Sequence, residues 1–102
     1  MHYVYVIYSL SADRYYIGET VDIQARIHQH NTHFFKGAFT TIASDWKLAL
    51  LFTCSDRPAA LKVEKHLKQM KSKQYLTRLH NDIAAQEKLK LIIRDKYGIE
   101  VQ

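Results

Sequence analysis

The sequence contains only one cysteine, so no disulfide bond can form within the chain. That residue, Cys54, ends an apolar run over 48–54, and this position predicts a buried thiol with a structural role. The chain also lacks an apolar stretch long enough to cross a bilayer. Residues 1–3 run straight into a strand pattern, without the basic region and small-residue cleavage site of a signal peptide. We therefore expect a cytoplasmic protein.

Internal repeats and low-complexity tracts are absent too, and a length of 102 residues fits one compact domain. Hydrophobic residues make up 47% of the chain, which is enough to form a core. The formal net charge of +5 favours a polyanionic partner, and nucleic acid is the commonest one for a small basic domain. The seven tyrosines and one tryptophan suit either stacking on unpaired bases or ordinary core and strand packing.

The first part of the chain predicts a hairpin followed by a helix. Residues 2–8 are mainly β-branched and aromatic, which indicates a strand buried on both faces. After a polar turn, residues 15–18 form the returning strand. Thr20 is the expected N-cap of the next helix, Asp22 lies in its first turn, and the helix runs to about His30.

The remainder predicts one more strand and a series of helices. A loop over 31–45 precedes a strand over 46–54, and Asp56 can cap the helix that follows. The helical pattern continues to about Gly98, with a break near Lys71-Ser72. The predicted fold class is therefore α/β, with a small three-stranded, mostly antiparallel sheet flanked by helices.

Polar groups border the apolar face of the first helix. Ile23 and Ile27 lie four residues apart and define its buried stripe. Arg26 and His30 are also four residues apart, and at about 100° per residue they fall beside that stripe. Both side chains are therefore expected to border the sheet.

The second helix places a carboxylate on its inner face. Glu64 falls within the apolar stripe, which consists of Ala60, Val63, Leu67 and Met70. A carboxylate there is costly unless a cation or hydrogen bonds compensate it. Glu64 is therefore either half of a structural ion pair, for example with Arg26, or a metal ligand or catalytic acid at the floor of a cleft. The outer face of this helix carries Lys62, Lys65 and Lys68.

Two tyrosines lie on neighbouring strands of the predicted hairpin. Tyr5 and Tyr16 can face the same way, either as a cross-strand aromatic pair or as part of a site. Gly18, at the end of the second strand, indicates close approach of another backbone or a ligand.

These residues occur in the order and spacing of a known family. Tyr3-Val4-Tyr5 and Tyr16-Ile17-Gly18 match its two tyrosine motifs, with ten residues between the last tyrosine of the first and the first tyrosine of the second. Arg26 follows the second tyrosine by ten positions, His30 stands four further on, and Glu64 matches a metal-binding glutamate. The chain resembles the GIY-YIG nuclease superfamily, in particular its small stand-alone members, and is similar to the incision domain of the bacterial excision-repair nuclease.

The segment Lys36-Gly37-Ala38-Phe39-Thr40, followed by Trp46, also resembles the small stand-alone members. The resemblance covers about residues 2–83, and a C-terminal helix is expected over about 84–97. It implies a single GIY-YIG domain over 1–102 with the GIY-YIG nuclease-like fold.

The resemblance also implies a metal-dependent endonuclease that hydrolyses phosphodiester bonds in DNA, possible settings being repair, recombination or defence. Glu64 would hold Mg²⁺ or Mn²⁺, and Arg26 would contact a nonbridging phosphate oxygen. Tyr5 would be the general base for the attacking water and Tyr16 would orient the water or the phosphate, although these two roles can be exchanged. His30 would assist by hydrogen bonding or as a proton relay. Because a tyrosine base has a high reference pKa, activity should rise toward alkaline pH.

Further residues are candidates for contacting nucleic acid. They are Gly18 and Lys36, together with the helix residues Lys62, Lys65, Lys68, Lys71 and Lys73. The helix lysines suit either tracking of the phosphate backbone or a plain solvated face.

Two positions depart from the family pattern. Tyr3 replaces the first glycine of the family name, and Glu19 stands where the repair nucleases carry a lysine. Both departures favour the alternative function, a non-catalytic nucleic-acid-binding module with the same fold. Asn81 is the candidate for an asparagine that some members carry late in the site.

Overall fold

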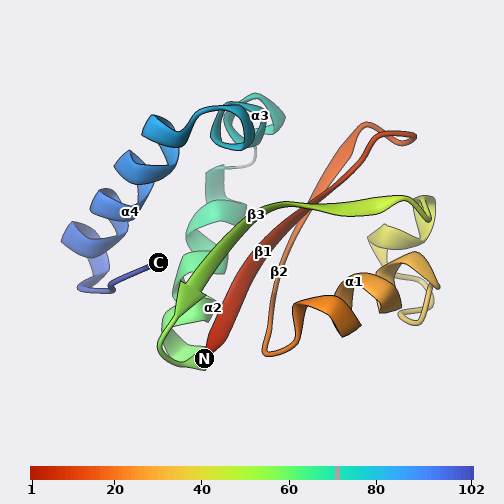
Figure 1. Ribbon diagram of the computed structural model, residues 1–102, viewed down its shortest axis with the longest axis horizontal. Coiled ribbons are helices and arrows are strands. Elements are labelled where there is room, and N and C mark those ends of the chain that lie inside the picture. The colour runs from red at the N-terminus through yellow and green to blue at the C-terminus, as the bar shows by residue number, and fades with distance from the viewer. Residues whose placement is uncertain (71) are drawn as a thin grey trace.

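The computed structural model describes residues 1–70 and 72–102. Its centre is a three-stranded sheet in the order β2-β1-β3, formed by β1 (His2–Ser9), β2 (Arg14–Thr20) and β3 (Trp46–Cys54) (Figure 1). Both strand pairs are antiparallel and helices flank the sheet, which confirms the predicted α/β class. Gln102 adds two backbone hydrogen bonds to Thr53, each 3.0 Å long, on the side of β3 that faces away from β1.

The helices cover both faces of this sheet. Figure 1 shows α1 on one side of the strands and α2, α3 and α4 on the other. Their bounds are α1 Ile23–Asn31, the 3₁₀ helix η1 Phe39–Ile42, α2 Arg57–Met70, α3 Lys73–Asn81 and α4 Ile83–Tyr97. Ser72 caps α3, because its hydroxyl accepts a hydrogen bond from the Tyr75 N–H at 3.1 Å. The predicted break therefore falls between α2 and α3, although Lys71 itself lies outside the described residues.

The central strand β1 is buried on both faces, as its sequence predicts. Val4 and Val6 pack toward α2 in the larger hydrophobic cluster, whereas Tyr5 and Ile7 pack toward α1 in a second cluster. All four side chains are at most 1% exposed. The alternation along β1 thus separates an apolar core from a face that carries the Tyr5 hydroxyl.

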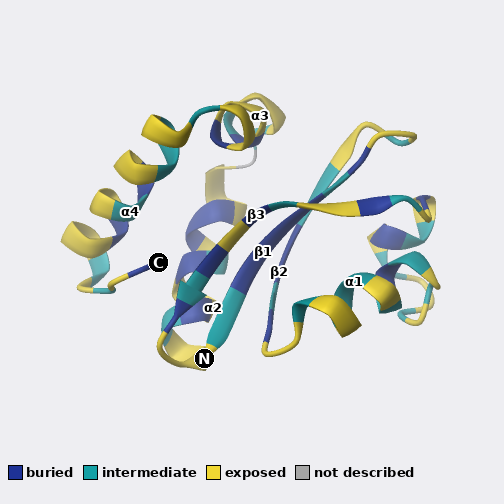
Figure 2. Ribbon diagram, in the orientation of Figure 1, coloured by how far each residue is buried: buried dark blue, intermediate teal, exposed yellow. Residues whose placement is uncertain are grey.

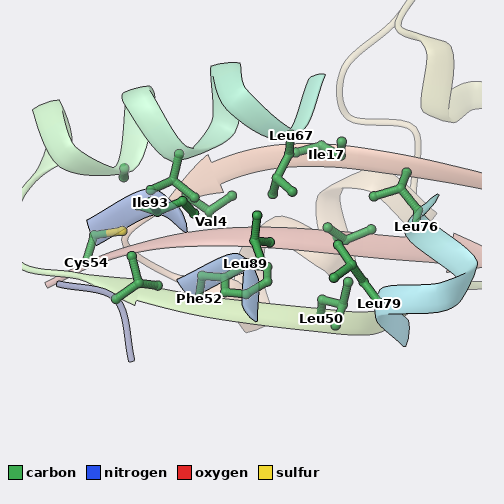
Figure 3. Packing of buried hydrophobic residues seen from close by; sticks show 14 residues of the cluster. Val4, Ile17, Leu50, Phe52, Cys54, Leu67, Leu76, Leu79, Leu89 and Ile93 are labelled. Atoms are coloured by element: carbon green, nitrogen blue, oxygen red, sulfur yellow. The ribbon is translucent and has the colours of Figure 1, made fainter. Parts of the chain in front are cut away.

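The larger cluster is closed by the three C-terminal helices. Leu67 of α2, Leu79 of α3 and Ile93 of α4 converge on the strands, where they meet Phe52 of β3 (Figure 3). Figure 2 shows that these helices turn their exposed residues outward, as amphipathic helices do. Burial of this kind, rather than helix propensity, provides most of the stability of such helices.

Two local predictions are wrong. Thr20 is not the N-cap of α1, because it remains in β2 opposite Tyr3; the cap is Asp22, whose carboxylate accepts a hydrogen bond from the Ala25 N–H at 3.1 Å. Met70 does not belong to the buried stripe of α2. It is 43% exposed, because it borders a groove between α2, α3 and α4.

Other local predictions are confirmed. The Asp56 carboxylate accepts a hydrogen bond from the Ala59 N–H at 2.9 Å at the start of α2, and Gly98 ends α4 with a φ of 69°. Cys54 is 1% exposed, and burial raises the pKa of its thiol, as expected of a structural residue. Among residues 1–70 and 72–102, no helix has the length and apolar character needed to cross a membrane.

Candidate active site

The site begins with the pairing of Tyr5 and Gly18 across the β1–β2 hairpin. The two residues are directly opposite each other in the register. A β-carbon on Gly18 would lie 2.5 Å from Cζ of the Tyr5 ring, which is far inside contact distance. The close approach that Gly18 permits is therefore that of the Tyr5 side chain, rather than of another backbone or a ligand. Without a side chain on β2 at this point, the Tyr5 ring can lie across the strand.

His30 holds the Tyr5 hydroxyl from the last turn of α1. The hydroxyl and His30 Nε2 are hydrogen-bonded at 2.8 Å, and the His30 side chain is buried. Ile23 and Ile27 pack against the same cluster as Tyr5, so the face of α1 predicted from its periodicity does turn toward the sheet. Burial, with a smaller contribution from the charge of Arg26, lowers the pKa of His30 to about 4. The imidazole is therefore neutral at pH 7.

An aromatic group surrounds this hydrogen bond. The ring centroid of Tyr16 lies 6.5 Å from that of Tyr5 and 5.0 Å from that of His30. Phe39 of η1 stacks on Tyr16, with centroids 6.5 Å apart and an interplanar angle of 16°. Phe35 lies 5.2 Å from the His30 ring, so the loop before β3 contributes two aromatic rings. Phe39 belongs to the family-like segment over 36–40, whereas Phe35 carried no signal in the sequence.

Arg26 and Glu64 both act electrostatically on Tyr5. Burial is the main cause of a raised Tyr5 pKa, and the neighbouring Tyr16 adds to the increase. The Arg26 guanidinium lowers this pKa by its positive charge, whereas the charge of the Glu64 carboxylate raises it. The net result is a phenol that remains protonated at neutral pH, with one cation and one anion close enough to influence it.

The environment of Arg26 favours an accessible guanidinium on the Tyr5 side of α1. Its Cζ atom lies 5.2 Å from the centroid of the Phe35 ring. The residue is half-buried, in agreement with its predicted place beside the apolar stripe. A guanidinium held over an aromatic ring keeps its planar donors free at the edge, which suits a phosphate oxygen.

Glu64 pairs with a lysine of its own helix. Its Oε1 accepts a hydrogen bond from Lys68 Nζ at 2.9 Å, and its side chain is 17% exposed. The structural ion pair considered for Glu64 therefore forms with Lys68, one helical turn further on, and not with Arg26. An exposed lysine on a flexible stem is a partner that a divalent cation can displace.

The other predicted contacts with nucleic acid lie on different surfaces. Lys36 is exposed in the loop before η1, and Gly18 is buried beneath Tyr5. Lys62 and Lys65 are exposed on the flank of α2 near α4, where they line a groove with Lys96 and Tyr97. On the opposite flank, a cavity of about 270 Å³ beside Tyr16 is lined by Lys68 and Lys73, with Arg14. The predicted lysine row is thus divided between two sides of α2, and Lys71 lies outside the described residues.

The departure from the family pattern at Glu19 has a structural explanation. Glu19 lies opposite Val4, so its side chain turns to the α2 face of the sheet, away from the Tyr5 hydroxyl. There Glu19 Oε2 is 3.2 Å from His2 Nε2, and Oε1 is 3.6 Å from Arg57 Nε. Asn81 ends α3, where its amide donates a hydrogen bond to the Thr77 carbonyl at 3.0 Å.

A divalent cation suits the donor set around Glu64, although one carboxylate is a small set. Within residues 1–70 and 72–102, no three His, Cys, Asp or Glu side chains form a cluster able to hold a metal. Mg²⁺ needs no such cluster, because it keeps several waters and binds one or two carboxylates together with substrate phosphates. The second Glu64 oxygen accepts no hydrogen bond from any other described residue, so it is available as a ligand.

The small antiparallel sheet and the tyrosine-centred polar site define a compact α/β domain with a buried phenol between a guanidinium and a carboxylate. The model of the GIY-YIG catalytic domain matches residues 1–77, and the chain belongs to this family. The match extends from β1 into α3 and includes Tyr5, Tyr16, Arg26, His30 and Glu64. GIY-YIG domains are nucleases, which hydrolyse phosphodiester bonds and generally depend on a divalent metal. No curated protein sequence matches the chain at a significant level.

Proposed function

We propose that this protein is an endonuclease that uses Mg²⁺ or Mn²⁺ to cut DNA, in repair, recombination or defence. The observation that carries the proposal is the buried Tyr5 hydroxyl, hydrogen-bonded to a neutral His30 and acted on by Arg26 and Glu64. A structural tyrosine needs neither a buried neutral imidazole on its hydroxyl nor two opposite charges beside it. The membership of the chain in a nuclease family supplies the reaction class.

In the proposed reaction, Tyr5 is the general base and Arg26 binds the phosphate. A water molecule loses a proton to the ionised Tyr5 oxygen, and its own oxygen forms a bond to phosphorus. The bond between phosphorus and the 3′ oxygen breaks, and the leaving oxygen acquires a proton from solvent. Arg26 binds a nonbridging oxygen of the same phosphate, because its planar donors match that geometry. Tyr16, which is half-buried beside Tyr5 and His30, orients the attacking water or the phosphate.

Because the pKa of Tyr5 is raised, ionisation of this phenol must be favoured by its surroundings before the site can react. Burial and the Glu64 charge oppose ionisation of Tyr5, and Arg26 favours it. When bound at Glu64, a divalent cation supplies positive charge that reverses the effect of this carboxylate and neutralises the phosphate. His30 contributes a hydrogen bond to the same phenol oxygen. Catalysis by Tyr5 therefore depends on Arg26, His30 and an occupied Glu64 together.

One observation favours a second candidate, a nucleic-acid-binding module that does not cleave. Lys68 occupies one oxygen of Glu64, and a cation has to compete with this pair. Such a module would bind with strong dependence on salt, because Lys and Arg contacts to phosphates release counterions.

Incubation of the purified protein with labelled nucleic acids separates the two candidates. The substrates are single strands, duplexes, flaps and branched junctions of DNA, with RNA equivalents, in Mg²⁺, in Mn²⁺ or with a chelator. We expect DNA cleavage that requires the metal and is lost in Tyr5→Phe, Arg26→Ala and Glu64→Gln. Matched controls are His28→Ala, which changes an exposed residue of α1, and Glu87→Gln, which changes an exposed carboxylate of α4.

Each outcome has a definite meaning. Salt-sensitive binding without cutting under any metal condition would favour the non-catalytic module, and preferential cutting of RNA would overturn the assignment of DNA. Equal loss of activity in the control variants would show that the substitutions damage the fold rather than the site. Absence of both binding and cleavage would contradict both candidates.

A further inference from the structure

Thr40 lies behind His30, on the side away from Tyr5. Its Oγ1 atom is hydrogen-bonded to His30 Nδ1 at 2.8 Å, while His30 Nε2 is hydrogen-bonded to the Tyr5 hydroxyl at the same distance. Thr40 is 1% exposed and His30 is 3% exposed, so water does not compete for either hydrogen bond. The three side chains therefore form one continuous buried hydrogen-bonded chain.

The backbone of η1 fixes Thr40 in this place. The Trp46 Nε1–H donates a hydrogen bond to the Thr40 carbonyl at 2.9 Å, and the Ala43 N–H donates to it at 3.4 Å. Trp46 itself is 2% exposed and belongs to the same hydrophobic cluster as Tyr5. These contacts fix the backbone at Thr40, so the loop before β3 holds the Thr40 hydroxyl against His30.

The hydrogen bonds of a neutral imidazole allow two arrangements. One ring nitrogen carries a hydrogen and the other accepts. In the first arrangement, Nδ1–H donates to Thr40, and the Tyr5 hydroxyl donates to Nε2. In the second arrangement, the Thr40 hydroxyl donates to Nδ1, and Nε2–H donates to the Tyr5 oxygen. The distances fit both arrangements, so the choice depends on which hydrogens would be left without an acceptor.

The buried Thr40 hydroxyl and the ionised form of Tyr5 together decide between them. No acceptor other than His30 Nδ1 lies within hydrogen-bonding distance of its hydrogen in the described part of the chain. The first arrangement would leave that hydrogen unpaired in the interior, at a cost of about 1–3 kcal/mol. The second arrangement satisfies Thr40 and leaves the hydrogen of a neutral Tyr5 hydroxyl without an acceptor among the described residues. Ionisation of Tyr5, which the proposed function requires, removes that hydrogen, so only the second arrangement then pairs every polar atom of the three side chains.

We propose that Thr40 is a positioning residue, which holds His30 as the Nε2–H tautomer so that its ring donates a hydrogen bond to the Tyr5 oxygen. This inference rests on the proposed function, in which Tyr5 is the general base. A hydrogen bond donated to the phenol oxygen stabilises the phenolate as it forms, and the Arg26 guanidinium acts in the same direction. Thr40 contacts neither the substrate nor the reacting atoms, and it acts only through His30.

Two substitutions at Thr40 separate its hydroxyl from its shape. Thr40→Val keeps the volume and removes the donor, whereas Thr40→Ser keeps the donor. Thr41→Val is the matched control, because Thr41 is the next residue of η1 and its hydroxyl bonds to the Ala38 carbonyl instead. All four proteins are compared by thermal unfolding, so that a folding defect is recognised.

The first readout is the tautomer of His30 in the metal-free protein without substrate. Nitrogen-15 NMR of histidine-labelled protein reports which ring nitrogen carries the hydrogen, and the His30→Gln variant assigns the signal. We expect Nε2–H in the wild type, Thr40→Ser and Thr41→Val, and a changed tautomer population in Thr40→Val. A wild-type His30 protonated on Nδ1 would overturn the proposal, whatever the activity.

The second readout is the division of the cleavage rate between kcat and KM. We expect Thr40→Val to lower kcat by about 10- to 100-fold, as is usual when the partner that orients a functional histidine is removed. KM should change little, and Thr40→Ser should recover most of kcat. Full kcat in Thr40→Val would contradict a positioning role. A wild-type protein that holds the Nε2–H tautomer but cleaves nothing would sink the proposed nuclease function while supporting the assignment of Thr40.

Discussion

Tyr5 occupies the space that a side chain on Gly18 would fill. The two residues face each other across the hairpin, and a β-carbon on Gly18 would lie 2.5 Å from the Tyr5 Cζ atom. The aromatic ring cannot retreat easily, because His30 holds its hydroxyl at 2.8 Å. One glycine in β2 therefore determines where the proposed general base lies.

Gly18→Ala should displace the Tyr5 ring and break its hydrogen bond to His30. We expect a loss of roughly 1–3 kcal/mol in the free energy of unfolding, as for other overpacked sites, and loss of cleavage. Urea denaturation measures the first and a cleavage assay the second. In a Tyr5→Leu background the shorter side chain makes room, so the added methyl should cost less there. An equal cost in both backgrounds would show that the strain arises elsewhere.

The folded protein should lose stability as pH falls from about 6.5 toward 4. The pKa of His30 is lowered to about 4, against about 6.5 in an unfolded chain. Between these values the unfolded state binds more protons than the folded state, so the free energy of unfolding rises with pH. The stability linked to His30 is fully present above about pH 6.5. The free energy of unfolding, measured by urea denaturation at several pH values, should depend less steeply on pH in His30→Gln than in the wild type. His66, whose pKa is also lowered, leaves a residual slope in that variant.

Cleavage should accelerate toward alkaline pH. The Tyr5 pKa is raised by burial and by Tyr16, so the fraction of phenolate in the loaded enzyme grows across the accessible range. Single-turnover rates in saturating metal should therefore increase between about pH 7 and 10. Tyr5→Phe should be slower by about 100-fold or more and should lose this dependence. A flat wild-type profile would contradict a tyrosine base.

Glu64→Gln should change the titration of Tyr5 in the absence of metal. The Glu64 charge raises the Tyr5 pKa, so its removal should lower this pKa, which carbon-13 NMR of labelled tyrosine can follow. Addition of Mg²⁺ or Mn²⁺ should also lower the Tyr5 pKa in the wild type and have no effect in the variant.

Stability should change by less than about 1 kcal/mol in Glu64→Gln, because Lys68, the partner in the lost pair, is 49% exposed. Glu87→Gln is the control, since Glu87 forms a comparable pair with Lys90 at 3.5 Å on α4. A metal response that persists in Glu64→Gln would show that a residue other than Glu64 binds the metal.

Periodicity predicted those parts of the site that lie on regular elements. The stripes on α1 and α2 placed Arg26, His30 and Glu64 toward the sheet, and alternation along the hairpin placed Tyr5 and Tyr16 on one face. These positions follow from the geometry of a helix or strand, which repeats and can be counted along the sequence.

Features that depend on the path of a loop or on local competition could not be predicted in this way. Thr40 and Phe39 belong to a polar loop without periodicity, and the buried threonine carried no signal that pointed to His30. Only the strand register shows why Gly18 is a glycine. The pair between Glu64 and Lys68 did carry a signal, since oppositely charged residues four apart on a helix often bond. Asp22 rather than Thr20 caps α1, because Thr20 pairs with Tyr3 at the end of β2.

The bonds between Gln102 and Thr53 bear on how the protein can be shortened. They cover part of the edge of β3, and α4 places Leu89 and Ile93 over the apolar core. A truncation at residue 77, the end of the family match, would remove both protections at once. The exposed strand edge and uncovered apolar surface would then favour aggregation between copies, even though every proposed catalytic side chain would still be present.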